Sequence, residues 1–485
     1  MYFCTHVMEN LKEKTAKGLL WGAVNNGTMQ VLNLLIGIVV LRQLTPEDTG
    51  LIGMLAIFSA IAGNLQSSGF STALINEKKP TAQQYNSVFW FNVLMGFALY
   101  ILLFLMAPLI AWFFHQPRLT ALSRFLFLSF FISSFGISIN AYMLKNMMNR
   151  EIAIVNITAL VLSGMTAILM ALNGMTYWSL AWQQVVNSTI LVLGRLCYVK
   201  WRPTLRFTFD YIRQTFSFSM KILVTMIVNT VNQNLLTVIF GRLFRDARVV
   251  GNFFQAYKWD SMAFQTIGGM VGQVAQPVLV DVREDKDREL NVFRKMLRFT
   301  AFLSFPALFG MALVAHELIL CTIGEEWMNC VPMLQILCIG GAFMPMYTLY
   351  QNLLISHGRS DINMWLNIGQ IVLQLAVILL FYRQGIIVMV MAYTAFNIVW
   401  FGAWQFYARR IVGLRFRQMA KDVAPFMLCA AVVMALTYAA TQAIANLYLL
   451  LVARILLAAV LYYMVMRLLN VVILRECMQF IKKKR

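Results

Sequence analysis

The chain has 485 residues, of which 60% are hydrophobic and 12% are charged, and its formal net charge is +20. Soluble domains are about 45–50% apolar and about 25% charged, so this composition excludes a water-soluble enzyme, a disulfide-stapled secreted domain and a disordered chain. We therefore expect an all-α polytopic membrane protein, in which each spanning helix needs about 20 mostly apolar residues.

Apolar stretches of this length recur from end to end and predict about 14 transmembrane helices. The predicted ranges are 18–41, 49–69, 86–114, 119–143, 152–172, 177–198, 217–241, 250–278, 298–320, 329–355, 361–382, 386–408, 422–442 and 446–470. The loops between these ranges are short, so we expect no sizeable soluble domain on either side of the membrane.

The basic residues predict the orientation of the helices. With the N-terminus in the cytoplasm, 31 of the 40 Lys and Arg residues lie on the cytoplasmic side, six lie in outer loops and three lie inside spans. This is the bias of the positive-inside rule, and an even number of spans then places both termini in the cytoplasm. The positive charge is thus a topology signal and a contact for anionic lipids, rather than a nucleic-acid patch.

The two halves of the chain echo each other at an offset of about 200–210 residues. Three pairs of positions at equivalent span boundaries carry the echo: Gly50 with Gly251, Arg150 with Arg359, and Arg206 with Arg415. A repeat of six spans crosses the membrane an even number of times, so both copies have the same orientation. We expect two six-helix lobes related by a pseudo-two-fold axis along the membrane normal, with substrate bound between them near the midplane.

The predicted organisation follows from these spans. It consists of a cytoplasmic N-terminal segment (1–17), an N-lobe (18–198), a cytoplasmic inter-lobe linker (199–216), a C-lobe (217–408), a second cytoplasmic linker (409–421), two further helices (422–470) and a basic cytoplasmic tail (471–485).

Short motifs recur in a fixed order along most of the chain. They are residues 41–48 (LRQLTPED) with Gly50, 69–75 (GFSTALI), 251–258 (GNFFQAYK), Trp327 with Pro332 and 334–337 (LQIL), and Gly358 with Arg359. In order and coverage, from about residue 11 to about residue 420, the chain resembles the polysaccharide transporter family, the oligosaccharide flippases of the multidrug/oligosaccharidyl-lipid/polysaccharide exporter superfamily. The branch it resembles contains the colanic acid and teichuronic acid exporters. One departure is the sequence at 252–254 (NFF), where the family usually has a tyrosine.

The resemblance implies a fold like that of the multidrug and toxin extruders, with two six-helix lobes. It implies a flippase that translocates undecaprenyl-diphosphate-linked oligosaccharides across the bacterial inner membrane by alternating access, for surface polysaccharide synthesis. The implied partners are this lipid-linked oligosaccharide and membrane lipids, and a polysaccharide polymerase and chain-length machinery are open candidates. Neither catalysis nor a cofactor nor nucleic acid is expected.

Three predicted spans carry polar stripes at helical spacing. The stripes contain Gly22, Asn26, Gln30, Asn33 and Gly37 in the first span, Lys221, Thr225, Asn229 and Asn232 in the seventh, and Gln255, Lys258, Gln265, Gly269, Gln273 and Gln276 in the eighth. Polar groups that face lipid cost several kcal/mol each, so the stripes are expected to face other helices or a wet cavity. Amides both donate and accept hydrogen bonds and suit sugar hydroxyls, while interhelical hydrogen bonding is the alternative.

Charged residues inside spans are candidates for function. Lys258 is predicted to contact the diphosphate of the lipid carrier, with a structural ion pair or snorkelling as the alternative. Lys221, at the cytoplasmic mouth of its span, would receive the substrate headgroup or anchor the helix. Arg124 is a further substrate candidate that snorkelling also explains, and Arg454 is expected to snorkel or to contact lipid. Asp260 is the candidate for proton or sodium coupling, since we place no other carboxylate well inside a span.

Two alternatives belong to other functional classes. A drug or metabolite antiporter of the same superfamily would need an acidic cavity for cationic cargo, whereas the charges inside these spans are mainly basic. A polysaccharide-assembly enzyme would need catalytic groups in a larger outer loop. Glu47 and Asp48 are adjacent in the first outer loop, but their neighbours indicate a turn before a helix. A scaffold without transport activity would have no need for the polar stripes.

Cysteine and glycine patterns favour structural roles. The seven cysteines show no C-x-x-C spacing and mostly fall in apolar runs, so we expect small buried hydrophobic residues and no metal site. Gly268 and Gly272 form a G-x-x-x-G pattern inside an apolar segment, which predicts close helix packing.

Overall fold

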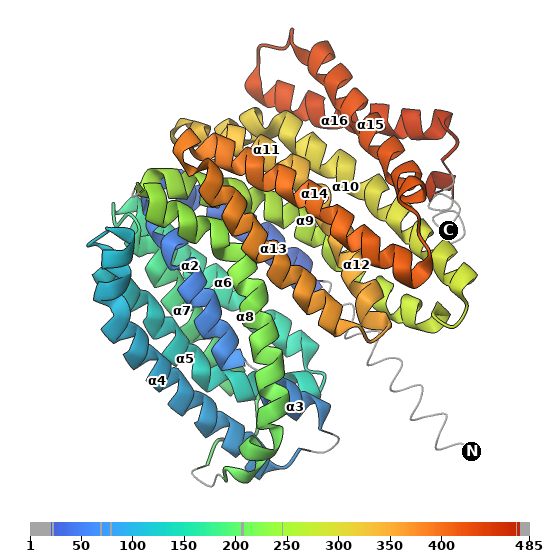
Figure 1. Cartoon of the computed structure of the whole chain (residues 1–485). Helices are drawn as coiled ribbons and strands as arrows, with labels where there is room; N and C mark the ends of the chain where they lie inside the picture. The colour runs from blue at the N-terminus through green and yellow to red at the C-terminus, as the bar shows by residue number, and fades with distance from the viewer. Residues whose placement is uncertain are drawn as a thin grey trace. The chain divides into compact units, whose positions relative to one another are not determined.

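The computed structural model describes residues 21, 24–67, 70–77, 80–204, 208–244, 246–471 and 473–475 (Figure 1). Helices and short connections make up this part of the chain, and it contains no strand. The predicted all-α architecture is confirmed. The chain divides into two compact units, Met1–Gly251 and Asn252–Arg485.

The first unit is a bundle built mainly from neighbouring pairs of helices, α4 with α5 and α6 with α7, while α8 runs along α2. Its helices are Val24–Leu41, α2 (Pro46–Ser67), α3 (Phe70–Asn76), α4 (Ala82–Phe114), α5 (Leu119–Lys145), α6 (Asn149–Leu172), α7 (Trp178–Tyr198) and α8 (Asp210–Phe244).

The second unit is organised around α10, which packs against α11, α15 and α16. Its helices are α9, α10 (Lys286–Thr322), α11 (Val331–Gly341), α12 (Met344–Ser356), α13 (Ser360–Phe381), α14 (Ile386–Val412), α15 (Phe416–Thr441) and α16 (Leu447–Leu468). Helix α9 spans Ala247–Val282, so its first turn belongs to the first unit.

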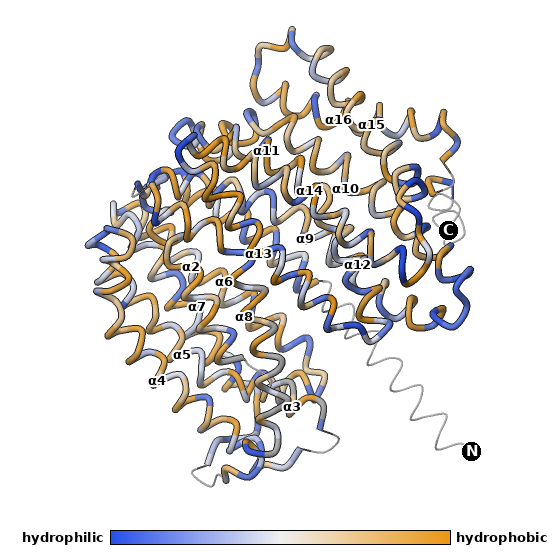
Figure 2. Tube along the Cα trace, viewed as in Figure 1, coloured by the Kyte–Doolittle hydropathy of each residue, from blue (hydrophilic) through white to orange (hydrophobic). Residues whose placement is uncertain are grey.

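Eleven helical segments of the described residues are long and apolar enough to cross a membrane. Figure 2 shows hydrophobic residues along most helices of both units. Helices α7, α8 and α9 coincide with the predicted ranges 177–198, 217–241 and 250–278 but are not among the eleven. The chain is therefore a multi-pass membrane protein, while the count of about 14 spans and the six-helix lobes stay predictions.

The predicted tenth span is broken into pieces. A 3-10 turn (Glu325–Cys330) leads into α11, which ends at Gly341, and α12 begins at Met344. Ser304 of α10 donates a hydrogen bond from its hydroxyl to the carbonyl of Ala342 at 2.5 Å, which satisfies a backbone group that the break exposes. Pro345 in the first turn of α12 has no N–H to contribute, so it suits a new helix start.

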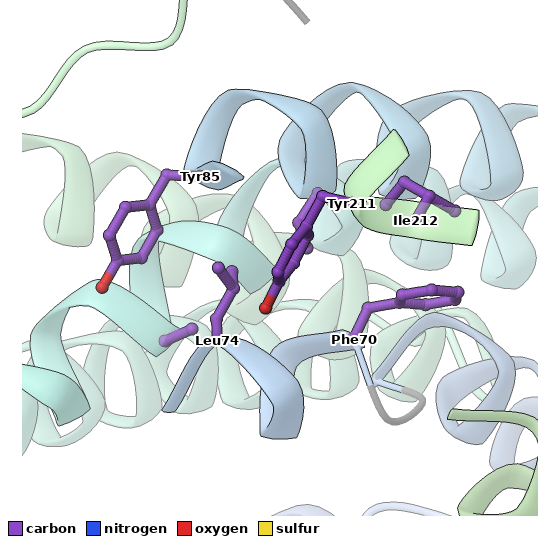
Figure 3. Packing of buried hydrophobic residues seen from close by; sticks show 7 residues of the cluster. Phe70, Leu74, Tyr85, Tyr211 and Ile212 are labelled. Carbon is purple, nitrogen blue, oxygen red and sulfur yellow. The ribbon is translucent and has the colours of Figure 1, made fainter. Parts of the chain in front are cut away.

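Helix α8 packs at both of its ends against other helices of the first unit. At its beginning, Tyr211 and Ile212 enter a buried cluster with Phe70, Leu74 and Tyr85 from α3 and α4 (Figure 3). Burying each large apolar or aromatic side chain contributes about 1.5–3 kcal/mol to stability, so this cluster stabilises the packing of the start of α8 against α3 and α4.

The other end of α8 is fixed by contacts with the end of α4. Arg242 donates from Nη1 to the carbonyl of Phe113 at 2.9 Å, and a Cβ added at Gly241 would lie 2.8 Å from the Phe114 ring. Midway along the helix, Asn64 of α2 donates to the Thr230 hydroxyl at 2.5 Å. Helix α8 is thus an integral part of the first unit.

Candidate functional site

Helix α9 has a polar exposed face and a packed face. Lys258, Gln265 and Gln273 are exposed, whereas Gln255 and Asp260 are 2% and 3% exposed. Among the described residues no carboxylate pairs with Lys258. The residues of the predicted stripe in the eighth span therefore separate: the lysine and three of the four glutamines, Gln276 included, are exposed, whereas Gln255 is in the core.

The packed face of α9 meets α12 through small residues. A Cβ added at Gly268 would lie 3.3 Å from the Thr348 hydroxyl, and one added at Gly272 would lie 3.4 Å from the Thr348 methyl group. Missing side chains allow the two helices to approach closely. The close packing predicted from the G-x-x-x-G pattern is confirmed.

Asp260 is enclosed by the end of α11. A Cβ added at Gly341 would lie 2.2 Å from Asp260 Oδ1, so the carboxyl group occupies space that only a glycine leaves free. The Cys338 thiol, one turn earlier, lies beside the carboxyl group. Oδ1 itself is buried and has no hydrogen-bond partner among the described residues. A buried carboxylate without a cation is costly, which marks Asp260 as a functional candidate.

A polar network joins α12, α13 and α14 within the second unit. Gln370 donates to the Asn397 side-chain oxygen at 2.9 Å, and the Tyr347 hydroxyl donates to the Asn397 backbone carbonyl. Both amides are at most 5% exposed. These amides serve interhelical bonding, the role that the sequence left open for amides in the stripes.

In the first unit, the stripe of the first span lies on the exposed side of helix Val24–Leu41. Asn26, Gln30 and Asn33 are all exposed. The Asn33 amide donates to the Met29 carbonyl of its own helix at 2.9 Å, so it makes an intrahelical bond. Exposure of three amides in succession on a spanning helix leaves them available to a polar ligand or to water.

The remaining predicted residues differ in placement. Asn232 is partly exposed on α8, and the side chains of Lys221 and Asn229 lie outside the described part of the structure. Arg124 donates from Nε to the Phe104 carbonyl at 3.4 Å, and its guanidinium lies 4.3 Å from the centre of the Phe104 ring. Arg124 is thus bound to α4, and its predicted substrate role stays a prediction.

The expectation that Arg454 snorkels or contacts lipid is wrong. Its side chain is 7% exposed and forms a 2.7 Å ion pair with Glu317, which is 6% exposed. Nε also donates to the Thr441 hydroxyl at 3.2 Å. The pair borders a largely apolar cavity of about 550 Å³ between α10 and α16. Asp260 is the one carboxylate that the sequence predicts well inside a span, yet Glu317 falls within the range predicted for the ninth span.

A second ionic link fastens α15 to α10. Arg294 donates from Nε and Nη2 to the two oxygens of Asp422 at 2.7 and 3.1 Å, in the bidentate geometry that favours this pair. Asp422 is 5% exposed. The two ion pairs together attach α15 and α16 to separate points along α10.

The cysteines mostly behave as predicted. Cys321, Cys330 and Cys338 are buried, and Cys429 is partly buried. Cys197, at the end of α7, is exposed, so the prediction of burial does not hold there.

Comparison with known proteins gives matches over most of the chain. The profile of the family described as "Polysaccharide biosynthesis protein" matches residues 39–332. The lipopolysaccharide biosynthesis protein WzxC of Escherichia coli (strain K12) is 26% identical over 368 residues, which cover 74% of this chain and 73% of that protein. The teichuronic acid biosynthesis protein TuaB of Bacillus subtilis (strain 168) is 24% identical, with 76% of each chain covered.

Solved structures support the fold. The structure of the lipid II flippase MurJ in an inward closed conformation matches with a TM-score of 0.73 at 15% identity, over 92% of this chain and 97% of that one. A MATE structure in complex with MaL6 matches with a TM-score of 0.51 at 14% identity, over 81% and 95%. At such identities the likeness concerns the fold alone, and it agrees with the fold expected from the sequence.

Proposed function

The chain belongs to the polysaccharide biosynthesis protein family, and from that premise we propose that it is a flippase for undecaprenyl-diphosphate-linked oligosaccharide repeat units. It would move them across the bacterial inner membrane by alternating access, without catalysis, for surface polysaccharide synthesis. The observation that carries the proposal is the exposed polar side of α9, which bears Lys258, Gln265 and Gln273 on a helix that packs closely against α12 at Gly268 and Gly272.

Lys258 would bind the diphosphate of the lipid carrier. Lys258 is an exposed residue, and no described carboxylate pairs with it. The exposed amides of Gln265 and Gln273 would bind sugar hydroxyls, because an amide offers both a donor and an acceptor. Asn26 and Gln30 of the first unit have the same chemistry and exposure, and they too would bind sugar hydroxyls.

Asp260 would couple transport to a proton or sodium gradient. Its enclosed carboxyl group with an unpartnered oxygen supports reversible loading of a small cation. Because a charge that crosses the membrane gains about 2.3 kcal/mol per 100 mV, one such cation per cycle would provide a useful driving force.

The proposed orientation places both termini in the cytoplasm, following the distribution of Lys and Arg. The repeat boundaries at 18–198 and 217–408 are part of the same proposal. A polymerase and chain-length machinery would take the flipped repeat unit on the far side of the membrane. The names of the relatives, which refer to lipopolysaccharide and teichuronic acid biosynthesis, support this place in polysaccharide assembly.

The first test removes the protein from its host and extracts the prenyl-linked glycans for mass spectrometry. We expect a complete repeat unit to accumulate on its lipid carrier, together with loss of surface polymer. Polymer synthesis without such accumulation, in a host shown to have no second flippase, would refute the function.

The second test complements the same strain with Lys258→Ala and Lys258→Arg at equal membrane levels. We expect Ala to abolish polymer export and Arg to restore part of it, because Arg keeps the positive charge. Lys421→Ala, at an exposed position in the first turns of α15, is the matched control and should export normally. Full export by Lys258→Ala would eliminate the proposed role of this lysine.

A further inference from the structure

A pair of titratable side chains joins the end of α12 to the start of α10. Nε2 of His357, the residue that follows α12, lies 2.7 Å from Oε1 of Glu289 in the first turn of α10. The Glu289 side chain is 0% exposed, whereas that of His357 is 25% exposed. Protons from water can therefore reach this buried pair through the imidazole ring.

Glu289 depends on His357 for its charge balance. Its second carboxyl oxygen, Oε2, is buried and has no hydrogen-bond partner among the described residues. His357 is also the one described residue that forms an ion pair with it. A buried carboxylate without a cation is costly, so the packed arrangement keeps a proton on the pair, whichever of the two residues carries it.

Charged groups on the neighbouring elements have other partners. Arg283, just after α9, donates from Nη1 to the backbone carbonyl of Ser356 at 3.3 Å. At the start of α13, Arg359 and Asp361 pair with each other at 3.3 Å. Two arginines of α10 bind one carboxylate of α15, and these three residues are Arg294, Arg298 and Asp422. The balance between Glu289 and His357 is thus set within the pair.

Helix α12 is a short segment whose last turn is fixed by this pair. It has 13 residues and begins after the break that follows α11. Its middle is attached to α14, because the Tyr350 hydroxyl donates to Oε1 of Gln405 at 2.6 Å, and the Tyr350 ring packs against Phe293 of α10. His357 lies about two turns beyond Tyr350, so it adds a separate point of attachment to α10.

We propose that the His357–Glu289 pair makes the packing of the end of α12 against α10 dependent on cytoplasmic pH. The packed form holds one proton on the pair, whereas on separation Glu289 ionises in water and His357 becomes a free imidazole. Histidine changes charge between about pH 5 and 8, so the separated form loses this proton as the pH rises. Acidic conditions therefore favour the packed form, and a rising pH weakens it by up to about tenfold per pH unit.

The cytoplasmic side in this inference rests on the proposed orientation. The pH dependence itself belongs to the second unit and can be measured without cargo. Regulation of this kind would make the mobility of the half-helix α12, which packs against α9 at Gly268 and Gly272, responsive to the state of the cell.

The test measures access to the last turn of α12 in the purified full-length protein. Ser356 is 4% exposed, so Ser356→Cys should react with a hydrophilic maleimide only when this turn separates. Labelling at position 356 is quantified by peptide mass spectrometry and divided by the rate for the unfolded protein at the same pH, which cancels the pH dependence of thiol chemistry. We expect this relative rate to rise about tenfold or more between about pH 6 and about pH 8.

Matched variants assign the effect to the pair. Glu289→Gln combined with His357→Gln offers a neutral hydrogen bond that takes up no proton, so its relative rate should be the same at both pH values. Glu289→Gln alone should behave likewise, and it replaces the double variant if that one does not fold. His316→Gln is the control, since His316 is 51% exposed and 3.6 Å from Glu317, and it should keep the pH dependence of the parent.

A pH dependence that is equal in the parent and in the folded Gln variants would overturn the proposal. Faster labelling at acidic pH would do so too, as would loss of the pH dependence in His316→Gln. If Ser356→Cys does not fold, thermal unfolding replaces labelling, and the midpoint of the parent should fall relative to that of the Gln variants as the pH rises.

The side of the membrane is tested in vesicles with an impermeant maleimide. Position 356 should react in inside-out vesicles, and reaction only in right-side-out vesicles would overturn the cytoplasmic assignment. A pH dependence confirmed in a protein whose deletion leaves lipid-linked glycans unchanged would refute the proposed cargo and not the role of this pair.

Discussion

Replacement of Arg454 should destabilise the second unit, because the buried carboxylate of Glu317 would lose its positive partner. Arg454 and Glu317 are 7% and 6% exposed and 2.7 Å apart, so replacing Arg454 by Met strands a carboxylate in a site with little access to water. Removal of one partner of a buried pair costs about 3–5 kcal/mol. The hydrogen bond to Thr441 is lost as well. For a unit of this size the expected fall in the unfolding temperature is about 6–20 °C.

The assay is thermal unfolding of the purified protein in one detergent, followed by tryptophan fluorescence. The double variant Arg454→Met with Glu317→Gln should recover most of the loss, because neutral groups of similar volume replace both charges. Arg359→Met is the matched control, since Arg359 and Asp361 form a pair that is 55% and 60% exposed, and its unfolding temperature should stay close to that of the parent. A fall for Arg454→Met no larger than that for the control would refute the reasoning. A double variant as unstable as the single one would show that packing, rather than the stranded charge, dominates.

Two further substitutions test other contacts of the second unit by the same unfolding assay. Gly341→Ala brings a methyl group into the space of the Asp260 carboxyl group and should cost about 1–3 kcal/mol, whereas Gly269→Ala, in open space, should have a much smaller effect; equal effects would contradict the close packing. Asp422→Asn weakens the bidentate link to Arg294 and should cost about 1–3 kcal/mol, and an unchanged midpoint would show that the link between α10 and α15 is dispensable.

Local sequence signals predicted the helices well. Hydrophobic runs gave each long helix of the structure to within a few residues at most ends, because a spanning helix satisfies its own backbone and needs only length and apolarity. The exceptions include the starts of α8, α10 and α15, which begin at Asp210, Lys286 and Phe416 rather than at 217, 298 and 422. Helix α8 begins at Asp210, several residues before the predicted 217, because tertiary contacts of Tyr211 and Ile212 hold its polar first turns. The break between α11 and α12 was missed because apolar residues continue through it.

Contacts between residues that are far apart in the chain could not be predicted from local sequence patterns. No local pattern connects Arg454 to Glu317, so the sequence predicts a snorkelling side chain where the structure has a buried ion pair. Similarly, the G-x-x-x-G pattern predicted a close approach at Gly268 but not its partner helix. Helical spacing alone also grouped Gln255 with Lys258, which the structure separates into a buried and an exposed residue.

The attachment of α8 to the first unit has a consequence for protein engineering. The sequence repeat predicts a junction at 199–216, whereas contacts place the end of the first compact unit at Gly251. A chimaera of two relatives spliced at the earlier junction would pair α8 of one parent with Phe70, Leu74 and Asn64 of another. A splice within the first turn of α9 would keep those contacts together. The repeat predicted from the sequence and the packing of the structure thus define different modules, and recombination should follow the packing.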